Sequence, residues 1–317
     1  MGFRVPVLII FWRRPSTVQR VIDAVRPIAP QRVFLAGDGP SPERPQENIL
    51  VAETRNMVET QIDWPCRIER LYSATNQGCR RAVEAAINWF FQQEQEGIIL
   101  EDDCVPHPEF FSFCSGLLQR YRDDARVGCI TGNNFQNGIR RSPESYYFSK
   151  YPHCWGWATW RRAWSLYSQK LEFWPAWRKS EAWFKRFNNP AERRYWQSIF
   201  DQAYIRKIDS WAYPWTASLW HAGRLTATPQ VNLVQNVGFG SNATHTKGQE
   251  AEFSVPSEGL GPIVHPAEVM INQEADEYVF RNLFFRGSAV HGGKMIREAK
   301  KIWKFIGGMA KKLRTEF

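Results

Sequence analysis

The first hundred residues of this chain repeat one order of local structure, and that order limits the fold more than any other feature. Three times, an apolar run is followed by a polar turn and by a segment with helical periodicity. The expected strands lie at 5–11, 32–36 and 67–72, and the expected helices at 15–25, 43–61 and 80–93. A fourth apolar run, at 97–100, ends the series. Strands that alternate with helices in this way are typical of a parallel sheet covered by helices on both faces. The sequence therefore predicts an α/β fold with a mostly parallel, doubly wound sheet.

Each of the four expected strands is followed by polar residues. These are Arg13 and Arg14, then Asp38, then Asn76, and finally Glu101, Asp102 and Asp103. In an open α/β sheet the carboxyl ends of the parallel strands share one edge, and ligands bind there. Guanidinium groups suit phosphate or a nucleotide base, and a carboxylate can accept hydrogen bonds from the base. This edge is therefore a candidate site for a nucleoside diphosphate.

The three consecutive acids at 101–103 follow a strand that is expected to be buried. Adjacent carboxylates repel one another, and they are costly near a core unless a cation or hydrogen-bond donors compensate them. Mg²⁺ or Mn²⁺, which prefer oxygen ligands, would be a natural partner. The alternative interpretation is a solvated acidic turn that caps the next helix, whose first turn is expected at 106–110.

Two common phosphate-binding motifs are absent from the sequence. Neither G-x-G-x-x-G nor G-x-x-x-x-G-K-[ST] occurs. Their absence argues against a dinucleotide-dependent oxidoreductase and against a P-loop NTPase. We therefore expect a metal ion to hold the phosphates.

Several segments give the chain a resemblance to one family. They are Asn76-Gln77-Gly78-Cys79, Trp89-Phe90-Phe91, the run 97–104, the run 155–160, Ser210-Trp211-Ala212-Tyr213, and the runs 236–240 and 243–246. Together with the Arg-Pro pair after the first strand, they resemble bacterial GT-A nucleotide-diphospho-sugar transferases of the hemolysin-like group. More distantly, the chain is similar to N-acetylglucosaminyltransferase I, which is an inverting, Mn²⁺-dependent enzyme that uses a UDP-sugar. The resemblance implies a GT-A (Rossmann-like) fold and metal-dependent glycosyl transfer.

The resemblance also implies roles for the acids and for two neighbours of the site. Asp103, the last acid, would be the direct metal ligand, and Asp102 would contact the ribose. Glu101 would face the donor sugar or orient the site. Asn76 belongs to the nucleotide-binding edge. His245 lies in a loop that resembles the segment closing over the pyrophosphate, although a neutral histidine satisfied by neighbouring hydroxyls is an equal alternative.

For the nucleotide base, the resemblance implies that Asp38 and one arginine hold the uracil. The extra residue in Phe11-Trp12-Arg13-Arg14-Pro15 leaves both Arg13 and Arg14 open. Arg14 is favoured because it precedes the proline.

An inverting transfer needs a base that takes the proton of the acceptor hydroxyl. Asp209 is the first candidate, and Asp201 is its main rival. Either could equally be a helix cap or a solvated surface charge.

Tryptophan is concentrated in the middle of the chain, where 11 of the 15 fall between residues 155 and 220. Indole rings can stack on sugars, so this region is a candidate for the acceptor side of a cleft. Most of these rings are nevertheless expected in the core. Trp155 and Trp211, which lie in turns, are the candidates for acceptor contact.

The chain of 317 residues divides into three parts by composition. Residues 1–250 are expected to form the catalytic domain, and 251–293 an extension with a loop at 246–266 and a short helix at 274–285. Residues 294–317 carry a net charge of +6 out of the total of +9, with apolar residues at helical spacing. This pattern predicts a basic amphipathic helix, which either lies on an anionic membrane surface or docks on the body. Charge confined to one tail disfavours nucleic-acid binding.

No signal peptide or membrane-spanning segment is evident, so we expect a cytoplasmic protein, with the tail at the inner face of the membrane in the first case. The six cysteines show no paired C-x-x-C spacing. Reduced thiols in the core are therefore expected, rather than disulfides or a zinc site.

The sequence thus predicts a metal-dependent, inverting glycosyltransferase that moves a sugar from a nucleotide-diphospho-sugar to a hydroxyl of a glycan or a lipid-linked glycan. Two other classes remain open. A nucleotidyltransferase or phosphotransferase could use the same acids, and a non-catalytic carbohydrate-binding module would account for the tryptophans.

Overall fold

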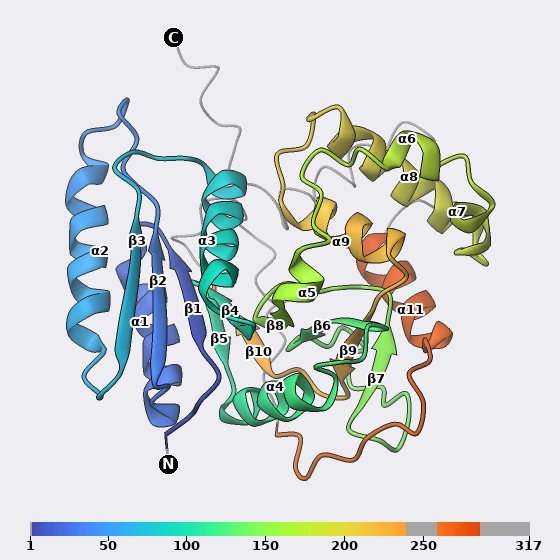
Figure 1. Cartoon of the computed structure of the whole chain (residues 1–317), viewed down its shortest axis with the longest axis horizontal. Helices are drawn as coiled ribbons and strands as arrows, with labels where there is room; N and C mark the ends of the chain where they lie inside the picture. The colour runs from blue at the N-terminus through green and yellow to red at the C-terminus, as the bar shows by residue number, and fades with distance from the viewer. Residues whose placement is uncertain (1, 239–258, 286–317) are drawn as a thin grey trace.

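The computed structural model describes residues 2–238 and 259–285. Its main sheet has the strand order β3-β2-β1-β4-β8-β6-β9-β7, and β10 pairs with β5 in a small second sheet (Figure 1). The strands are β1 Val7–Phe11, β2 Arg32–Gly37, β3 Arg67–Tyr72, β4 Glu96–Glu101, β5 Cys104–Pro106, β6 Val127–Thr131, β7 Tyr146–Ser149, β8 Trp157–Trp160, β9 Leu225–Pro229 and β10 Val234–Asn236. The helical segments are α1 Pro15–Val25, η1 Arg26–Ile28, α2 Glu47–Gln61, α3 Cys79–Gln93, α4 Pro108–Arg120, α5 Arg161–Trp164, α6 Trp174–Trp177, α7 Glu181–Lys185, α8 Pro190–Tyr204, α9 Ala212–His221, α11 Gln273–Val279 and η2 Phe280–Phe284.

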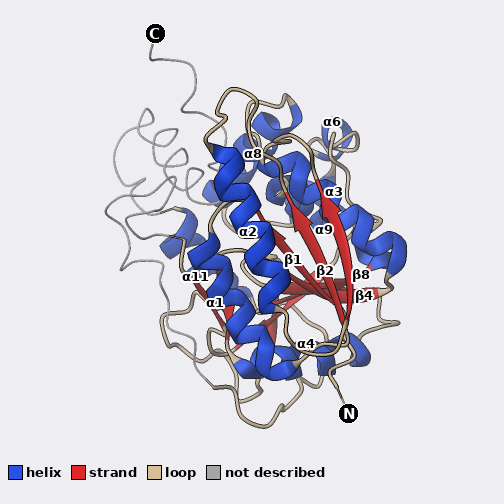
Figure 2. Ribbon diagram, turned by 90° about the vertical axis from the view of Figure 1, so that its left-hand side faces the viewer, coloured by secondary structure: helices blue, strands red, loops and turns tan. Residues whose placement is uncertain are grey.

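The amino-terminal half is doubly wound, as the sequence predicts. Strands β1 to β4 are all parallel, with β1 between β2 and β4. The chain steps from β1 to β2 to β3 in one direction and then returns past β1 to form β4. Because parallel crossovers are right-handed, this reversal puts α1 and α2 on one face of the sheet and α3 on the other (Figure 2). The α/β fold class is therefore confirmed.

The first helix, α1, has the bounds that the sequence predicts, and its residues show why. Pro15 occupies the first turn, where its missing N–H costs nothing. The buried residues Val18, Val21, Ile22 and Val25 recur at helical spacing and form one apolar face.

The second half of the sheet is mixed. Strand β8 lies between β4 and β6 and is antiparallel to both, and β7 is an antiparallel edge strand beside β9. The short strand β5 follows the acid triplet, so α4 begins at Pro108 and not at the expected position 106.

The tryptophans divide between two apolar cores. Ten of the eleven between residues 155 and 220 are buried, and Trp155 is half-buried. Trp157, Trp160 and Trp215 belong to the core of the sheet. Trp174, Trp183 and Trp220 belong to a second cluster, formed by α6 to α9 and the carboxyl-terminal helices at the upper right of Figure 1. Packing thus accounts for nearly all of the concentration seen in the sequence.

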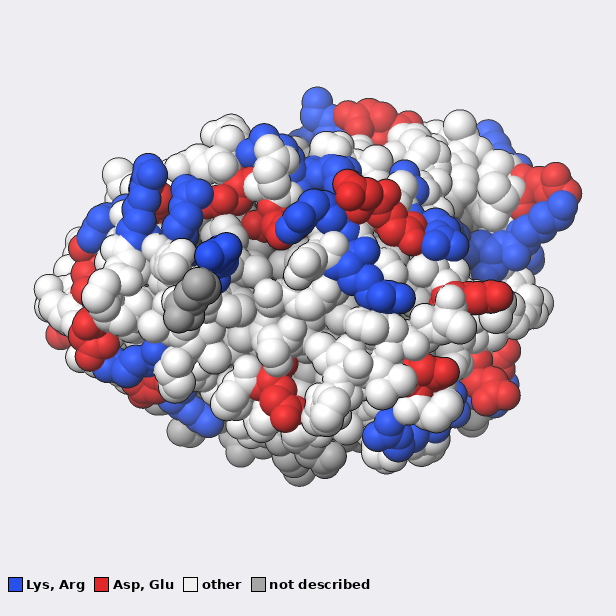
Figure 3. Space-filling view, turned by 60° about the horizontal axis from the view of Figure 1, so that its bottom comes forward, with Lys and Arg blue, Asp and Glu red and all other residues white. Residues whose placement is uncertain are grey.

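The short helix expected at 274–285 is present as α11 followed by the π-helical turn η2. The predicted basic helix at 294–317 and the loop residues 246–258 lie outside the described residues. Within the described part, no helix is both long and apolar enough to cross a membrane. On the face shown in Figure 3, acidic and basic side chains are interleaved. All six cysteines are free thiols, of which Cys104, Cys114 and Cys129 are buried.

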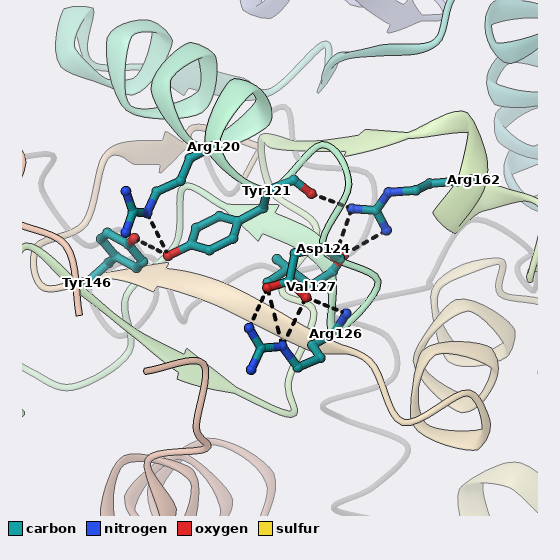
Figure 4. Close-up of polar contacts among 7 residues, drawn as sticks. All are labelled: Arg120, Tyr121, Asp124, Arg126, Val127, Tyr146 and Arg162. Carbon is teal, nitrogen blue, oxygen red and sulfur yellow. Dashed lines mark hydrogen bonds and ion pairs between the residues drawn. The ribbon is translucent and has the colours of Figure 1, made fainter. Parts of the chain in front are cut away.

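Arg162 holds the turn between α4 and β6 (Figure 4). Its guanidinium donates hydrogen bonds to the carbonyl oxygens of Arg122 and Tyr121, at 2.7 Å each, and to those of Val127 and Asp124, at 3.0 and 3.1 Å. Replacing Arg162 by Met would leave these acceptors without their donor. We expect the free energy of unfolding to fall by about 1–3 kcal/mol in urea titrations.

Arg126, in the same turn, provides a matched control. It pairs with Asp124 at 2.7 Å, but its side chain is 65% exposed. Arg126→Met should cost less than about 1 kcal/mol, because exposed ion pairs contribute little. Equal losses in the two variants would contradict a specific role of Arg162 in this turn.

Candidate functional site

The candidate site lies where the first four strands end. Strand register places Phe11 opposite Gly37 and Ile10 opposite Glu101, so the loops after β1, β2 and β4 leave the sheet at the same level. The strand order reverses between β1 and β4, and the crevice outside such a reversal is where open α/β sheets bind ligands. Arg14 follows β1, Glu101 ends β4, and Asp102 and Asp103 come directly after it, so these residues border the crevice.

Arg14 bridges the two last acids of the triplet. Its Nη2 donates to Asp103 Oδ2 at 2.9 Å and forms a shorter contact with Asp102 Oδ1, and its Nε donates to Asp102 Oδ2 at 3.2 Å. Burial lowers the pKa of the guanidinium, but the charges of Asp102 and Asp103 raise this pKa by a larger amount. The net shift is therefore upward. Arg14 is therefore the cation that compensates these carboxylates.

Glu101 differs from the other two acids. It is the last residue of β4, and desolvation, followed by the charges of Asp103 and Asp102, raises the pKa of its carboxyl to about 8. Desolvation also raises the pKa of Asp102, against the influence of Arg14. The sequence argument assumed three charges that need an outside cation. The structure reduces that need, because Arg14 pairs with two of the acids and burial disfavours the charged form of the third.

Asp103 is also contacted by Asn236 and Gly238, which lie more than 130 positions later in the sequence. Strand β10 pairs with β5 and brings Asn236 opposite Cys104, where its amide Nδ2 lies 3.4 Å from Asp103 Oδ1. Gly238 packs directly against the carboxylate, since a Cβ there would lie 2.3 Å from Asp103 Oδ2. Only glycine allows this approach. These two residues stand in the 236–240 run of the sequence, but no local pattern linked them to Asp103.

The side chains near Asp103 that could bind a metal ion limit the kind of metal site that fits. Within the described residues, no group of three His, Cys, Asp or Glu side chains could enclose an ion. The side chain of Asp103 is 18% exposed and offers carboxylate oxygens at the crevice. Mg²⁺ and Mn²⁺ often bind through one or two carboxylates together with water and substrate phosphates. The residues present thus fit an ion that arrives with a diphosphate, and they do not fit a closed protein cage.

The other residues predicted to bind the nucleotide are also engaged with protein groups. Asp38 is buried and accepts hydrogen bonds from Asn76 Nδ2 at 2.9 Å and from the backbone N–H of Gln77 at 2.9 Å. Asp38 and Asn76 therefore meet, and together they fix the loop between β3 and α3. Arg13 pairs with Glu47 at 2.6 Å, and its guanidinium lies over the ring of Trp12.

The structure separates the two candidates for the catalytic base. Asp209 accepts a hydrogen bond of 2.6 Å from Nε of Arg80, which lies in the first turn of α3. Burial and then the charges of Glu101, Asp209, Asp103 and Asp102 raise the pKa of the Cys79 thiol. Asp201 instead accepts from Trp174 Nε1 and from Arg178, both at 2.8 Å, in the second aromatic cluster. Of the two candidates, Asp209 is the one that pairs with α3, whose first residue, Cys79, also experiences the charges of the triplet.

The remaining predicted contacts divide in three ways. His245 lies outside the described residues. Trp211 is 4% exposed and stacks on Trp157 with ring centroids 5.7 Å apart, so it is a core residue and the expectation that it faces an acceptor is corrected. Trp155 is half-buried, and it lines a pocket whose other walls come from α8, α9 and η2.

The role of Arg14 can be tested through stability. Arg14→Met should lower the free energy of unfolding near pH 7 by about 3 kcal/mol, because two carboxylates would lose their cation. Adding Asp102→Asn should recover part of this loss, since it removes the more buried of the two charges. Urea unfolding of the wild type, both single variants and the double variant gives the coupling between the residues. A double variant no more stable than Arg14→Met alone would refute charge compensation as the function of Arg14.

No protein-family model matches this chain. Among solved structures, it is similar to the mannosyltransferase PcManGT from Pyrobaculum calidifontis in complex with GDP-Man and Mn²⁺, with 13% identity, coverage of 70% of this chain and 69% of that chain, and a TM-score of 0.38. It is also similar to a cytidylyltransferase from Leptospira borgpetersenii, with 11% identity, coverage of 52% and 64%, and a TM-score of 0.32. A third is 4-diphosphocytidyl-2C-methyl-D-erythritol synthase from Anaerococcus prevotii, with 11% identity, coverage of 63% and 85%, and a TM-score of 0.31. Likenesses this distant carry no conclusion about activity.

Proposed function

We propose that this protein is a GT-A-like glycosyltransferase, which moves a sugar from a nucleotide-diphospho-sugar to a hydroxyl group of a glycan or glycolipid. The observation that carries the proposal is the position of Arg14, Asp102 and Asp103 at the reversal of strand order between β1 and β4. That crevice offers a guanidinium for phosphate and a carboxylate for a metal ion at one point. A UDP-sugar is the donor that the sequence resemblance favours.

In this proposal the diphosphate lies over the end of β4. Arg14 contacts phosphate oxygens while it keeps one carboxylate as a partner, and Asp103, supported by Asn236, holds a divalent ion. The ion, Mn²⁺ or Mg²⁺, would stabilise the negative charge on the departing diphosphate. Asp102 faces the ribose, and Glu101 lies toward the sugar.

Asp209 is the proposed general base. It would take the proton from the acceptor hydroxyl as the hydroxyl oxygen bonds to the anomeric carbon and the bond from that carbon to the diphosphate breaks. Its ion pair with Arg80 fixes the orientation of the carboxylate, whose side chain is 39% exposed. An attack opposite the leaving group inverts the anomeric configuration. A nucleotidyltransferase using the same acids would release pyrophosphate, whereas the proposed reaction releases a nucleoside diphosphate.

Donor binding can be tested without knowing the acceptor. Thermal unfolding of the purified protein is followed with UDP, GDP, CMP and dTDP, each with and without Mn²⁺. One nucleotide at about a hundredfold its Kd should raise Tm by about 5 °C, and only when the metal is present. Asp103→Asn should abolish this rise, because it removes the charged ligand of the ion.

Asp123→Asn serves as the control for loss of one negative charge, because Asp123 is exposed in the turn after α4. It should leave the nucleotide response intact. If no nucleotide stabilises the wild type, or if Asp103→Asn responds as the wild type does, the proposed donor site is wrong.

The base is tested by comparing Asp209→Asn with Asp201→Asn. With the donor found above, labelled in its sugar and offered to a panel of glycoside acceptors, Asp209→Asn should lower kcat by at least about a hundredfold. Its nucleotide-dependent rise in Tm should persist, because the base does not hold the diphosphate. Asp201→Asn should keep kcat close to that of the wild type. The opposite ranking would assign the base to Asp201.

A further inference from the structure

Asn236 lies beside Asp103, the proposed metal ligand, although the two residues are 133 positions apart in the sequence. Strand β10 runs antiparallel to β5 and places Asn236 opposite Cys104. The backbone N–H of Val237 donates a hydrogen bond of 2.8 Å to the carbonyl oxygen of Asp103, which joins the two segments next to the carboxylate. Asn236 is also buried, with an exposed fraction of 5%. The small sheet therefore fixes the position of Asn236 against Asp103.

The orientation of the Asn236 amide is fixed as well. Its Oδ1 accepts a hydrogen bond of 2.8 Å from the backbone N–H of Gly238, and its Nδ2 donates to Asp103 Oδ1 over a longer distance of 3.4 Å. The reverse orientation would set the amide oxygen against a carboxylate oxygen and the NH₂ group against an N–H. Both contacts would be repulsive, since each would bring together two acceptors or two donors. The amide therefore presents only a donor to Asp103.

This orientation removes a potential metal ligand. Carbonyl oxygens, including those of amides, suit Mg²⁺ and Mn²⁺, whereas an amide NH₂ group has no lone pair to offer. The oxygen of Asn236 is engaged by the N–H of Gly238 and faces away from Asp103. Asn236 thus stands where a second ligand could stand, but it supplies none.

The two carboxylate oxygens of Asp103 are held unequally. Oδ2 accepts from Arg14 Nη2 at 2.9 Å, and Gly238 packs so closely against it that a Cβ would lie 2.3 Å away. Oδ1 has two longer contacts, with Asn236 Nδ2 at 3.4 Å and with Cys104 Sγ at 3.5 Å. Oδ1 is therefore the oxygen that a cation could take with the smaller loss of existing bonds.

We infer that Asn236 makes metal binding at Asp103 depend on the nucleotide. Its fixed amide steadies Asp103 through a donor and withholds the protein oxygen that would help an ion to bind by itself. The diphosphate then has to supply further oxygens, as substrate phosphates do for ions held by one or two carboxylates. This inference rests on the proposed donor site and adds a regulation to it: the ion and the donor bind together, and the protein without donor does not retain the ion.

Asn236→Asp tests this role, because a carboxylate offers acceptor oxygens on both sides. One oxygen can keep the hydrogen bond from Gly238, and the other replaces the NH₂ group beside Asp103. Binding of Mn²⁺ to the purified full-length protein is measured by EPR, which counts the free ion, with and without UDP or GDP. Without nucleotide, Asn236→Asp should bind Mn²⁺ at least about tenfold more tightly than the wild type, since it adds a charged ligand.

The wild type provides a second measurement that does not depend on the folding of any variant. The nucleotide that stabilises the protein should tighten its binding of Mn²⁺ at least about tenfold, and Mn²⁺ should tighten binding of that nucleotide by the same factor. This factor should be smaller in Asn236→Asp, because its added carboxylate already balances part of the charge of the ion.

Gln235→Glu is the matched control. It adds the same charge to the neighbouring residue of β10, whose side chain points to the other face of the strand. At 0.15 M ionic strength it should change the affinity for Mn²⁺ by less than about threefold, because the added charge is screened and does not touch the ion. Combining Asn236→Asp with Asp103→Asn should remove the gain in affinity, since the ion needs both carboxylates.

The outcomes separate this inference from the proposed function. Tight binding of Mn²⁺ by the wild type without nucleotide, no gain in Asn236→Asp, or an equal gain in Gln235→Glu would overturn the inference, even if nucleotide and Mn²⁺ together stabilise the wild type. A gain in Asn236→Asp without any nucleotide response of the wild type would instead refute the proposed donor site, and the inferred dependence on nucleotide with it.

Discussion

The ion pairs between Arg14 and the two aspartates after β4 are the interaction on which the candidate site depends. The parallel strands bring their carboxyl ends together, and the order β2-β1-β4 makes neighbours of two loops that are 88 residues apart in the chain. Two carboxylates at that point would repel each other in a partly buried crevice. Arg14 makes the arrangement stable, and the same guanidinium is suited to a phosphate. In the proposed function, stability and ligand binding therefore depend on the same charges.

This compensation changes how the acid triplet should be understood. The triplet alone suggests a metal site, but Arg14 already offsets one of the two charges on Asp102 and Asp103. One guanidinium against two carboxylates leaves one negative charge, so a divalent ion would bring positive charge in excess of it. A diphosphate supplies the negative charge that balances this excess. The geometry thus favours joint binding of metal and nucleotide over binding of the metal alone, as expected for ions that keep substrate phosphates as ligands.

The fold was predictable where the pattern is local. The strands β1 to β4 and the helices between them follow from apolar runs and helical spacing, which the chain expresses within short windows. The insertion of β8 between β4 and β6 was not predictable, because the partners are joined only by long-range pairing. The same limit applies to the site. The acids and Arg14 could be placed on one edge, but the burial of Trp211 against Trp157, and the contacts of Asn236 and Gly238 with Asp103, depend on tertiary packing.

The candidate site at the strand ends and the aromatic pocket of the second half, which Trp155 lines, are built by different means. The proposed donor side consists of strand ends and ion pairs, which hold charges at fixed positions and suit a diphosphate. The aromatic pocket lies where the two apolar cores meet, with Ala212 from the first and Tyr213, Trp196 and Phe284 from the second. Its walls come from short helices and turns, where side chains can change without disturbing the sheet.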